Sequence, residues 1–305
     1  MASLLDRKLL VLTGKGGVGK TTVSAALGLL AANRGLRTIV VEVGAQQRLP
    51  ELFGAAKQDA GRELELRKNL WSISIDPDRA LLEWLQALGG RVSGRVLASS
   101  GTFQYFAAAA PGAKELISMV KIWKLTQGSR RRSGGYDLVI LDAPATGHAL
   151  GMLHSPQTFG AIARVGPIAS QTQRVRELLS DPARTSYLAI AQPTEMAVTE
   201  TLELQDGLQQ KLDRTLHAVV LNGTLPRRFS AAELLQIDRL KVSSPVMHSA
   251  ALAAHAVHDR ARSQHNQLAR LRRRRFEVLP VPFIFTAELD LTAIELIAGH
   301  LSKRI

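Results

Sequence analysis

The sequence predicts an α/β fold with a doubly wound, mostly parallel sheet. Residues 8–43 show a strand, a glycine-rich loop, a helix and a second strand within about 35 residues, which is the unit from which such sheets are built. Further along the chain, short apolar strands alternate with longer helical stretches. This alternation is typical of a parallel sheet covered by helices on both faces.

The expected strands are short, mainly apolar runs. They cover residues 8–13, 38–43, 136–141, 186–191, 216–221 and 276–281. The expected helices have apolar residues at helical spacing, and the first is followed by Gly35, a typical helix stop. They cover residues 21–33, 157–179, 195–212, 231–240, 249–275 and 291–303. We expect one domain over residues 1–305. A helical subdomain at about 76–130, joined by 150–180, would be inserted in it, and 128–135 would form a mobile linker.

Composition limits the possible functions. The chain has 305 residues, 46% of them hydrophobic, and no cysteine, which excludes disulfides, cysteine-bound zinc and thiolate chemistry. No leader pattern opens the chain and no uncharged apolar run approaches about 18 residues, so we expect a cytoplasmic protein without a transmembrane helix. The net charge of +13 is compatible with nucleic acid, anionic lipid or an acidic partner. The arginine run at 272–275 has no interleaved aromatic residues, which favours a solvated helix end over a nucleic-acid site.

A phosphate-binding loop follows the first strand. Gly14, Gly19, Lys20 and Thr21 have the spacing GxxxxGK[ST] between a strand and a helix, as in P-loop NTPase folds. Glycines let the loop turn its amides toward phosphates, and the helix N-terminus adds positive potential. Lys20 is expected to contact the β- and γ-phosphates of ATP, with the Thr21 hydroxyl on Mg²⁺. The expected nucleotide-binding loop comprises Gly14, Lys15, Gly16, Gly17, Val18, Gly19, Lys20, Thr21 and Thr22.

Asp142 supplies the second part of the expected site. It ends the apolar strand at 136–141, and metal-assisted phosphoryl transfer needs a carboxylate at the end of a neighbouring strand. The alternative is a strand-end capping aspartate. The sequence therefore predicts ATP and Mg²⁺ as cofactors, with Thr21 and Asp142 on the metal side.

Lys15 directly follows the first glycine of the loop. The loop GKGGVGKTT thereby resembles the deviant Walker A loop of SIMIBI-class NTPases, in which the extra lysine reaches across a dimer interface to the partner's nucleotide. The resemblance implies that nucleotide binding is coupled to dimer closure. It also implies that Lys15 joins Lys20 and Asp142 as a catalytic residue.

The segment that begins at Asp142 carries a more specific resemblance than the loop does. Residues 142–156, DAPATGHALGMLHSP, resemble the switch segment of ArsA-type ATPases, and the matching positions are Asp142, Thr146, Gly147, His148, Leu150 and Pro156. The stretch 192–201 resembles a further family segment. The resemblance implies that Asn222 binds the adenine edge and that Val281 and Pro282 lie in the loop that closes over the base. Without the family, Asn222 is almost as well explained as a turn residue before Gly223.

The sequence departs from the family at Gly44. ATP-hydrolysing members have D-x-D-P-A-H after the second strand, and the second aspartate, which orients the attacking water, corresponds to Gly44. Glu42 matches the earlier acidic position and could replace the missing carboxylate only if the strand end shifts. It is expected instead to form a salt bridge with a loop lysine. One interpretation is an ArsA-like ATPase with weak hydrolysis, and another is a non-hydrolysing regulatory subunit. A third, a ParA-like DNA-associated ATPase, draws on the net charge, but residues 142–156 argue against it.

The expected partners follow from the resemblance. They are a second copy of the chain or an active ArsA-like paralogue, and a hydrophobic peptide or membrane-protein client. A client groove would use an apolar segment in the inserted helices, although an internal core explains it better. Its residues are Phe103, Tyr105, Phe106, Leu116, Ile117, Met119, Val120, Ile122 and Trp123. The lack of cysteine excludes thiolate binding of arsenite and a zinc-clamped dimer.

Overall fold

The computed structural model describes residues 4–44, 47–88, 112–128, 135–162, 166–240, 244–274 and 276–305. They contain an eight-stranded sheet with the order β3-β4-β2-β5-β1-β6-β7-β8. Neighbouring strands are parallel except β3 and β4, which confirms the predicted fold class. The strands are β1 (Leu9–Gly14), β2 (Thr38–Val43), β3 (Leu64–Arg67), β4 (Leu70–Ile75), β5 (Leu138–Ala145), β6 (Thr185–Ala191), β7 (Ala218–Thr224) and β8 (Glu277–Pro282).

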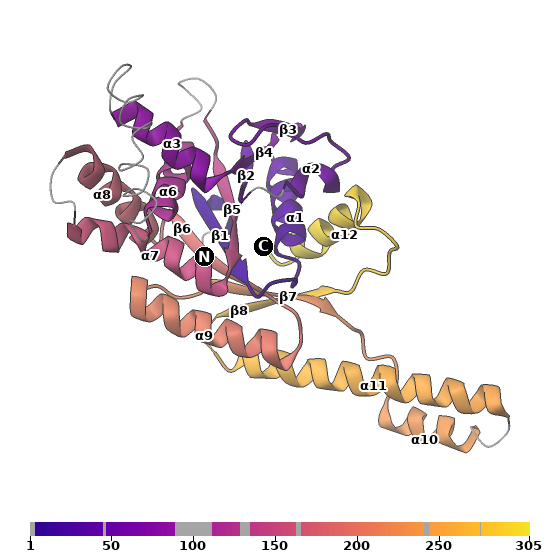
Figure 1. Ribbon diagram of the computed structural model, residues 1–305. Helices are drawn as coiled ribbons and strands as arrows, with labels where there is room; N and C mark the ends of the chain where they lie inside the picture. Colours follow the sequence, from indigo (N-terminus) through magenta and orange to yellow (C-terminus); the bar gives the residue numbers. More distant parts are fainter. Residues whose placement is uncertain are drawn as a thin grey trace.

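Helices cover both faces of the sheet (Figure 1). The helices α1 and α12 pack together on one face, and α6, α7, α8 and α9 contact strands on the other. The bounds are α1 (Lys20–Asn33), α2 (Leu49–Leu52), α3 (Pro77–Leu88), α6 (Ala113–Thr126), α7 (Thr146–Ile162), α8 (Gly166–Ser180), α9 (Glu195–Leu212), α10 (Ala231–Leu240), α11 (Pro245–Arg272) and α12 (Leu291–Ser302). Among the described residues, no helix is long and apolar enough to cross a bilayer.

Two strands were not predicted. The antiparallel pair β3 and β4 forms the edge of the sheet beyond β2, and Asn69 adopts a left-handed conformation (φ 63°) in the turn between them. β4 alternates buried and half-buried residues over most of its length, and three of the four residues of β3 are not buried. The pair therefore lacks the continuous apolar run that identified the central strands.

The structure also corrects the expected helix at 157–179. A helix, α7, already begins at Thr146, directly after β5, so most of the segment 142–156 is the first half of this helix. A second helix, α8, then follows from Gly166. These helices pack with α3 and α6 beside the sheet. In α6, the five apolar residues of the suggested groove other than Trp123 are buried, so they form an internal core: Leu116, Ile117, Met119, Val120 and Ile122. Phe103, Tyr105, Phe106 and most of the expected linker at 128–135 lie outside the described residues.

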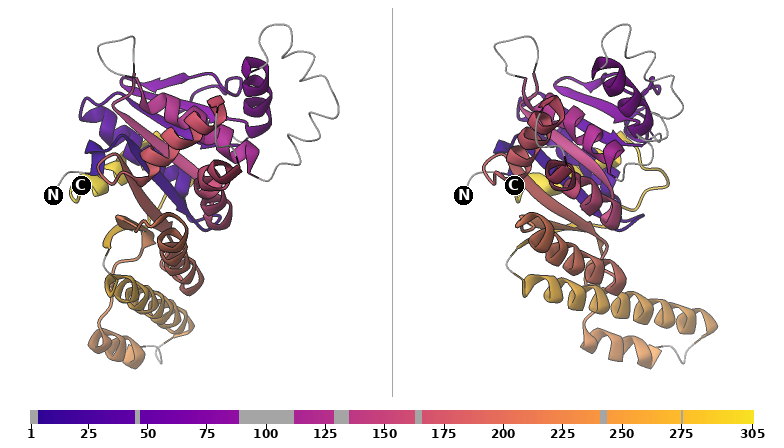
Figure 2. Two further views of the ribbon diagram at one scale, coloured as in Figure 1. Left: turned by 90° about the vertical axis from the view of Figure 1, so that its left-hand side faces the viewer. Right: turned by 60° about the vertical axis from the view of Figure 1, so that its left-hand side comes forward.

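The helices α10 and α11 lie side by side and project from the rest of the molecule (Figures 1 and 2). We call residues 231–272 the arm. Beside its root, β8 forms the other edge of the sheet and contains Pro280 and Pro282. The N–H of Phe283 donates to the Thr224 carbonyl on β7, which places the nitrogens of both prolines on the outer side of the strand.

Candidate nucleotide-binding site

The phosphate-binding loop connects the central strand β1 to α1. Gly17 and Gly19 have φ angles of 81° and 91°, a region that favours glycine. Gly14 approaches β6 so closely that an added Cβ would lie 2.1 Å from the Ile190 carbonyl oxygen. These two requirements explain why glycine stands at the positions that the motif specifies.

Lys20 begins α1 and folds back over the loop. Its ammonium donates to the carbonyl oxygens of Gly14 at 3.2 Å and Lys15 at 3.1 Å. Burial lowers the pKa of Lys20, which the carboxylate of Asp142 partly opposes. The lysine is thus held at the loop, where an anionic ligand would favour its charged form.

Asp142 lies on β5, directly below the start of α1. The Thr21 hydroxyl donates to one of its carboxylate oxygens at 2.6 Å, and the Ser24 hydroxyl to the other at 3.3 Å. Burial raises the pKa of Asp142, whereas the bond from Thr21 and the charge of Lys20 lower it. A hydroxyl and a carboxylate so arranged are hard oxygen donors of the type that Mg²⁺ prefers, so these two residues fit the metal.

Glu42 lies beside Asp142 on the adjacent parallel strand, because the two residues are partners in the β2–β5 register. Its carboxylate accepts the backbone N–H groups of Arg48 at 2.9 Å and Leu49 at 3.3 Å, at the start of α2. This corrects the expected salt bridge to a loop lysine. Burial, and secondarily the charge of Asp142, raises the pKa of Glu42 to about 7.

Gly44 directly follows β2 and has a φ angle of 127°. Its N–H donates to the Ile75 carbonyl and its own carbonyl accepts from the Ser74 hydroxyl, so β4 holds the backbone in place. Apart from its chain neighbours, no atom of the described residues lies within 4 Å of an added Cβ. The position has room for a side chain, but its backbone conformation favours glycine.

A cavity of about 290 Å³ adjoins the loop on the side of β7 and β8. Asn222 lines it, and its side-chain amide donates to the Val18 carbonyl at 2.9 Å. Pro282 also lines the cavity, whereas Val281 is fully buried and accepts a bond from the Thr224 hydroxyl. The structure therefore brings Asn222 and Pro282 to the loop and leaves Val281 beneath the surface.

Further residues complete these walls. Phe283, Ile284 and Leu289, in the segment after β8, line the cavity beside Asn222. The sequence feature that could have identified these residues is a group of apolar side chains directly after a strand. On the phosphate side, Arg48 lines a second cavity of about 390 Å³ together with Lys20, Thr21 and Thr22. Arg48 has no sequence signal, because it lies just beyond the motif that follows the second strand.

Lys15 does not line either cavity. Its ammonium is bonded to the carboxylate of Glu200 on α9. The structure thus brings Lys20 and Asp142 together and places Lys15 against its own chain.

A glycine loop between a central parallel strand and a helix, with a carboxylate on the neighbouring strand, defines a P-loop nucleotide-binding protein. The sequence profile of the anion-transporting ATPase (ArsA) family matches residues 7–168, more than half of the chain. The chain belongs to this family of ATPases.

Individual relatives agree with this assignment. The ATPase BagA of Mycobacterium tuberculosis is 27% identical over 256 residues, which are 81% of this chain and 74% of the relative. The ATPase GET3 of Paracoccidioides lutzii is 29% identical over 177 residues, or 56% and 50% of the two chains. A provisionally named arsenical pump-driving ATPase of Halobacterium salinarum is 26% identical over 272 residues, or 79% and 41%.

Proposed function

We propose that the chain binds ATP with Mg²⁺ in the two cavities beside the phosphate loop and couples the nucleotide state to closure of a dimer. The convergence of Lys20, Thr21 and Asp142 beneath these cavities is the main support. The base would occupy the cavity beside Asn222, and the phosphates would extend toward Lys20 and Arg48.

Each residue has a role that its contacts allow. Lys20 would exchange its bonds to two loop carbonyls for bonds to phosphate oxygens. These charge-assisted bonds would compensate the ammonium for the solvation that it loses by burial. Asp142 orients the hydroxyl of Thr21 toward the metal side of the loop. Bound Mg²⁺ would neutralise phosphate charge.

We propose that hydrolysis is slow, since Gly44 offers no acceptor for the proton of an attacking water. Single-turnover hydrolysis by Gly44→Asp and Gly44→Asn tests this. Both variants carry the same backbone strain and side chains of equal size, so the ratio of their rates isolates the carboxylate. We expect the Asp variant to be about 10- to 100-fold faster than the Asn variant. Equal rates, or a fast wild-type rate, would contradict a disabled switch.

A second candidate is a non-hydrolysing regulatory subunit paired with an active ArsA-like paralogue. The glycine conformation at Gly44 favours it, because an aspartate could not simply replace this residue without strain. Under this proposal the purified chain shows no turnover but raises the turnover of a co-purified paralogue when ATP is present. Turnover by the purified chain alone would exclude it.

A further inference from the structure

The arm concentrates positive charge. The arm and the short segments at its root comprise the described residues 225–240 and 244–274. They contain three acidic residues: Glu233, Asp238 and Asp259. Their described basic residues are three times as many: Arg227, Arg228, Arg239, Arg260, Arg262, Arg270, Arg272, Arg273 and Arg274. Much of the net charge of the protein therefore projects away from the nucleotide site (Figure 2). A surface of this kind attracts anionic partners at a distance.

The first half of α11 is apolar where it is exposed. Residues 245–258 contain no Asp, Glu, Lys or Arg. Ala251 and Ala254 are buried, whereas Val246 is 76% exposed and Leu252 is 59% exposed. One side of the helix therefore packs inward while the other presents aliphatic side chains to solvent.

Two arginines flank this apolar surface. Arg228 and Arg260 line a cavity of about 440 Å³ together with Ala256 and Val257 of α11. We call Val246, Leu252, Ala256, Val257, Arg228 and Arg260 the arm face. Long side chains such as arginine can cover apolar surface with their methylene groups and keep the charge at its edge.

We propose that the arm face docks on an anionic lipid surface. Exposed aliphatic side chains beside arginines are the combination that binds a helix in the plane of a bilayer interface. Anionic headgroups complement the charge of the arm, and each basic residue near such a surface adds to binding. None of these residues lines the cavities next to Lys20, and Arg260 borders a neighbouring cavity that Asn222 also lines.

Other anionic partners fit the arm face less well. Residues 230–274 contain no aromatic residue, and Phe285, which lines the same cavity as Arg228 and Arg260, already packs edge to face against Phe283. Exposed valine and leucine contribute nothing to contacts with phosphates. A second copy of the arm has the same positive charge and would be repelled. An anionic lipid surface uses both the aliphatic and the basic side chains of the arm face.

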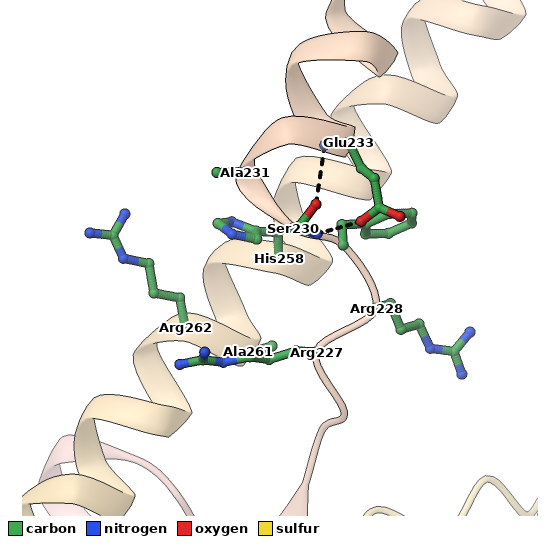
Figure 3. A pocket seen from close by; sticks show the side chains of 9 residues that line it. Arg227, Arg228, Ser230, Ala231, Glu233, His258, Ala261 and Arg262 are labelled. Carbon is green, nitrogen blue, oxygen red and sulfur yellow. Dashed lines mark hydrogen bonds between the residues drawn. The ribbon is translucent and has the colours of Figure 1, made fainter.

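The opposite side of the arm provides a matched control. Arg227 and Arg262 line another cavity, of about 700 Å³, at the start of α10, which Arg228 borders as well. Figure 3 shows Arg228 pointing away from Arg227 and Arg262. On α11, Arg260 and Arg262 are two residues apart, so they lie on nearly opposite sides of the helix. Ser230 and Glu233 exchange bonds here that cap α10, so this cavity is not assigned to a ligand.

The test measures flotation of the purified protein with vesicles of phosphatidylcholine alone or mixed with phosphatidylglycerol. We expect binding only to the mixed vesicles, and weaker binding as salt increases. The double variant Arg228→Gln/Arg260→Gln should lose about fivefold in partitioning per arginine. The control variant Arg227→Gln/Arg262→Gln removes equal charge from the other side and should lose clearly less.

A variant of an aliphatic residue tests whether apolar side chains of the arm face insert into the bilayer, as distinct from attraction of the arginines to its charge. Leu252→Ser should weaken vesicle binding about tenfold, whereas Leu296→Ser on α12, which replaces a leucine that is 51% exposed, should not. Circular dichroism confirms that each variant is folded. Equal losses for the two arginine pairs would overturn the proposal, as would absence of vesicle binding. So would binding of duplex DNA in place of vesicles with dependence on Arg228 and Arg260.

Discussion

The ammonium of Lys15 is bonded to the carboxylate of Glu200 on α9 of the same chain. In the resemblance that identified the loop, this lysine serves the nucleotide of a dimer partner. A dimer contact of that kind would need the same ammonium group. Glu200 would then compete with the partner for Lys15.

We expect Glu200→Gln to favour an ATP-dependent dimer by about two- to fivefold, because a half-exposed ion pair contributes roughly 0.2–1 kcal/mol. Light scattering with a non-hydrolysable ATP analogue measures the change. Glu203→Gln removes an exposed carboxylate from the same helix and should leave the dimer unchanged. A similar effect of both variants would show that only the overall charge matters.

Lys15 and Lys20 should have separable effects. Lys20→Ala is expected to weaken ATP binding about 10- to 100-fold, because it removes charge-assisted bonds to phosphate. Lys15→Ala should keep the ATP affinity within about twofold of the unsubstituted protein. A charge-assisted bond requires direct contact with the phosphates, and Lys15 does not line the cavities. Titration calorimetry of both variants compares them. Equal loss in the two variants would place Lys15 at the nucleotide of its own chain.

Gly19 and Asn222 should constrain one another. An added Cβ at Gly19 would lie 2.4 Å from the Asn222 amide nitrogen, and φ at Gly19 is 91°. Gly19→Ala should therefore cost about 1–3 kcal/mol of stability and weaken nucleotide binding. Gly16→Ala is the control, because no atom lies within 4 Å of its added Cβ and its φ is not positive. Thermal unfolding that ranks the two variants equally would contradict the close contact.

Glu42 should make stability depend on pH. Its pKa of about 7 lies above its ordinary value of 4.5, so between these values the folded state binds more protons than the unfolded state. Stability is then highest below pH 4.5 for this group and falls as pH rises toward 7, by about 3 kcal/mol in total. Glu42→Gln stays neutral and should flatten this fall. Urea unfolding across the window measures both proteins, and parallel curves would contradict the prediction.

The central strands could be predicted because their burial on both faces leaves a continuous apolar run. β2 coincides with the predicted range, and β6 begins one residue earlier than expected. β3 and β4 were missed, since an edge pair with one exposed side has no such run. Local pattern thus identifies an element only where the environment on both of its faces is uniform.

The candidate site shows the same division. The glycines and Lys20 follow from local chemistry, because a phosphate loop needs them at fixed spacing. Asp142 follows from its place at the end of an apolar strand. The capping role of Glu42 and the position of Arg48 depend on where α2 lies after the strand end. The bond from Lys15 to Glu200 joins residues 185 positions apart. Such contacts require the folded chain, since nothing in the local pattern encodes them.

The two prolines of β8 limit how copies of the chain can assemble. With Pro280 and Pro282 facing outward, this edge of the sheet offers no N–H donor at either position. Another strand therefore cannot add to the sheet along β8, either from a second copy or from an extended peptide. A dimer closed by nucleotide on this side of the sheet would form through loops and helices, which can separate again after each cycle without unpairing a strand.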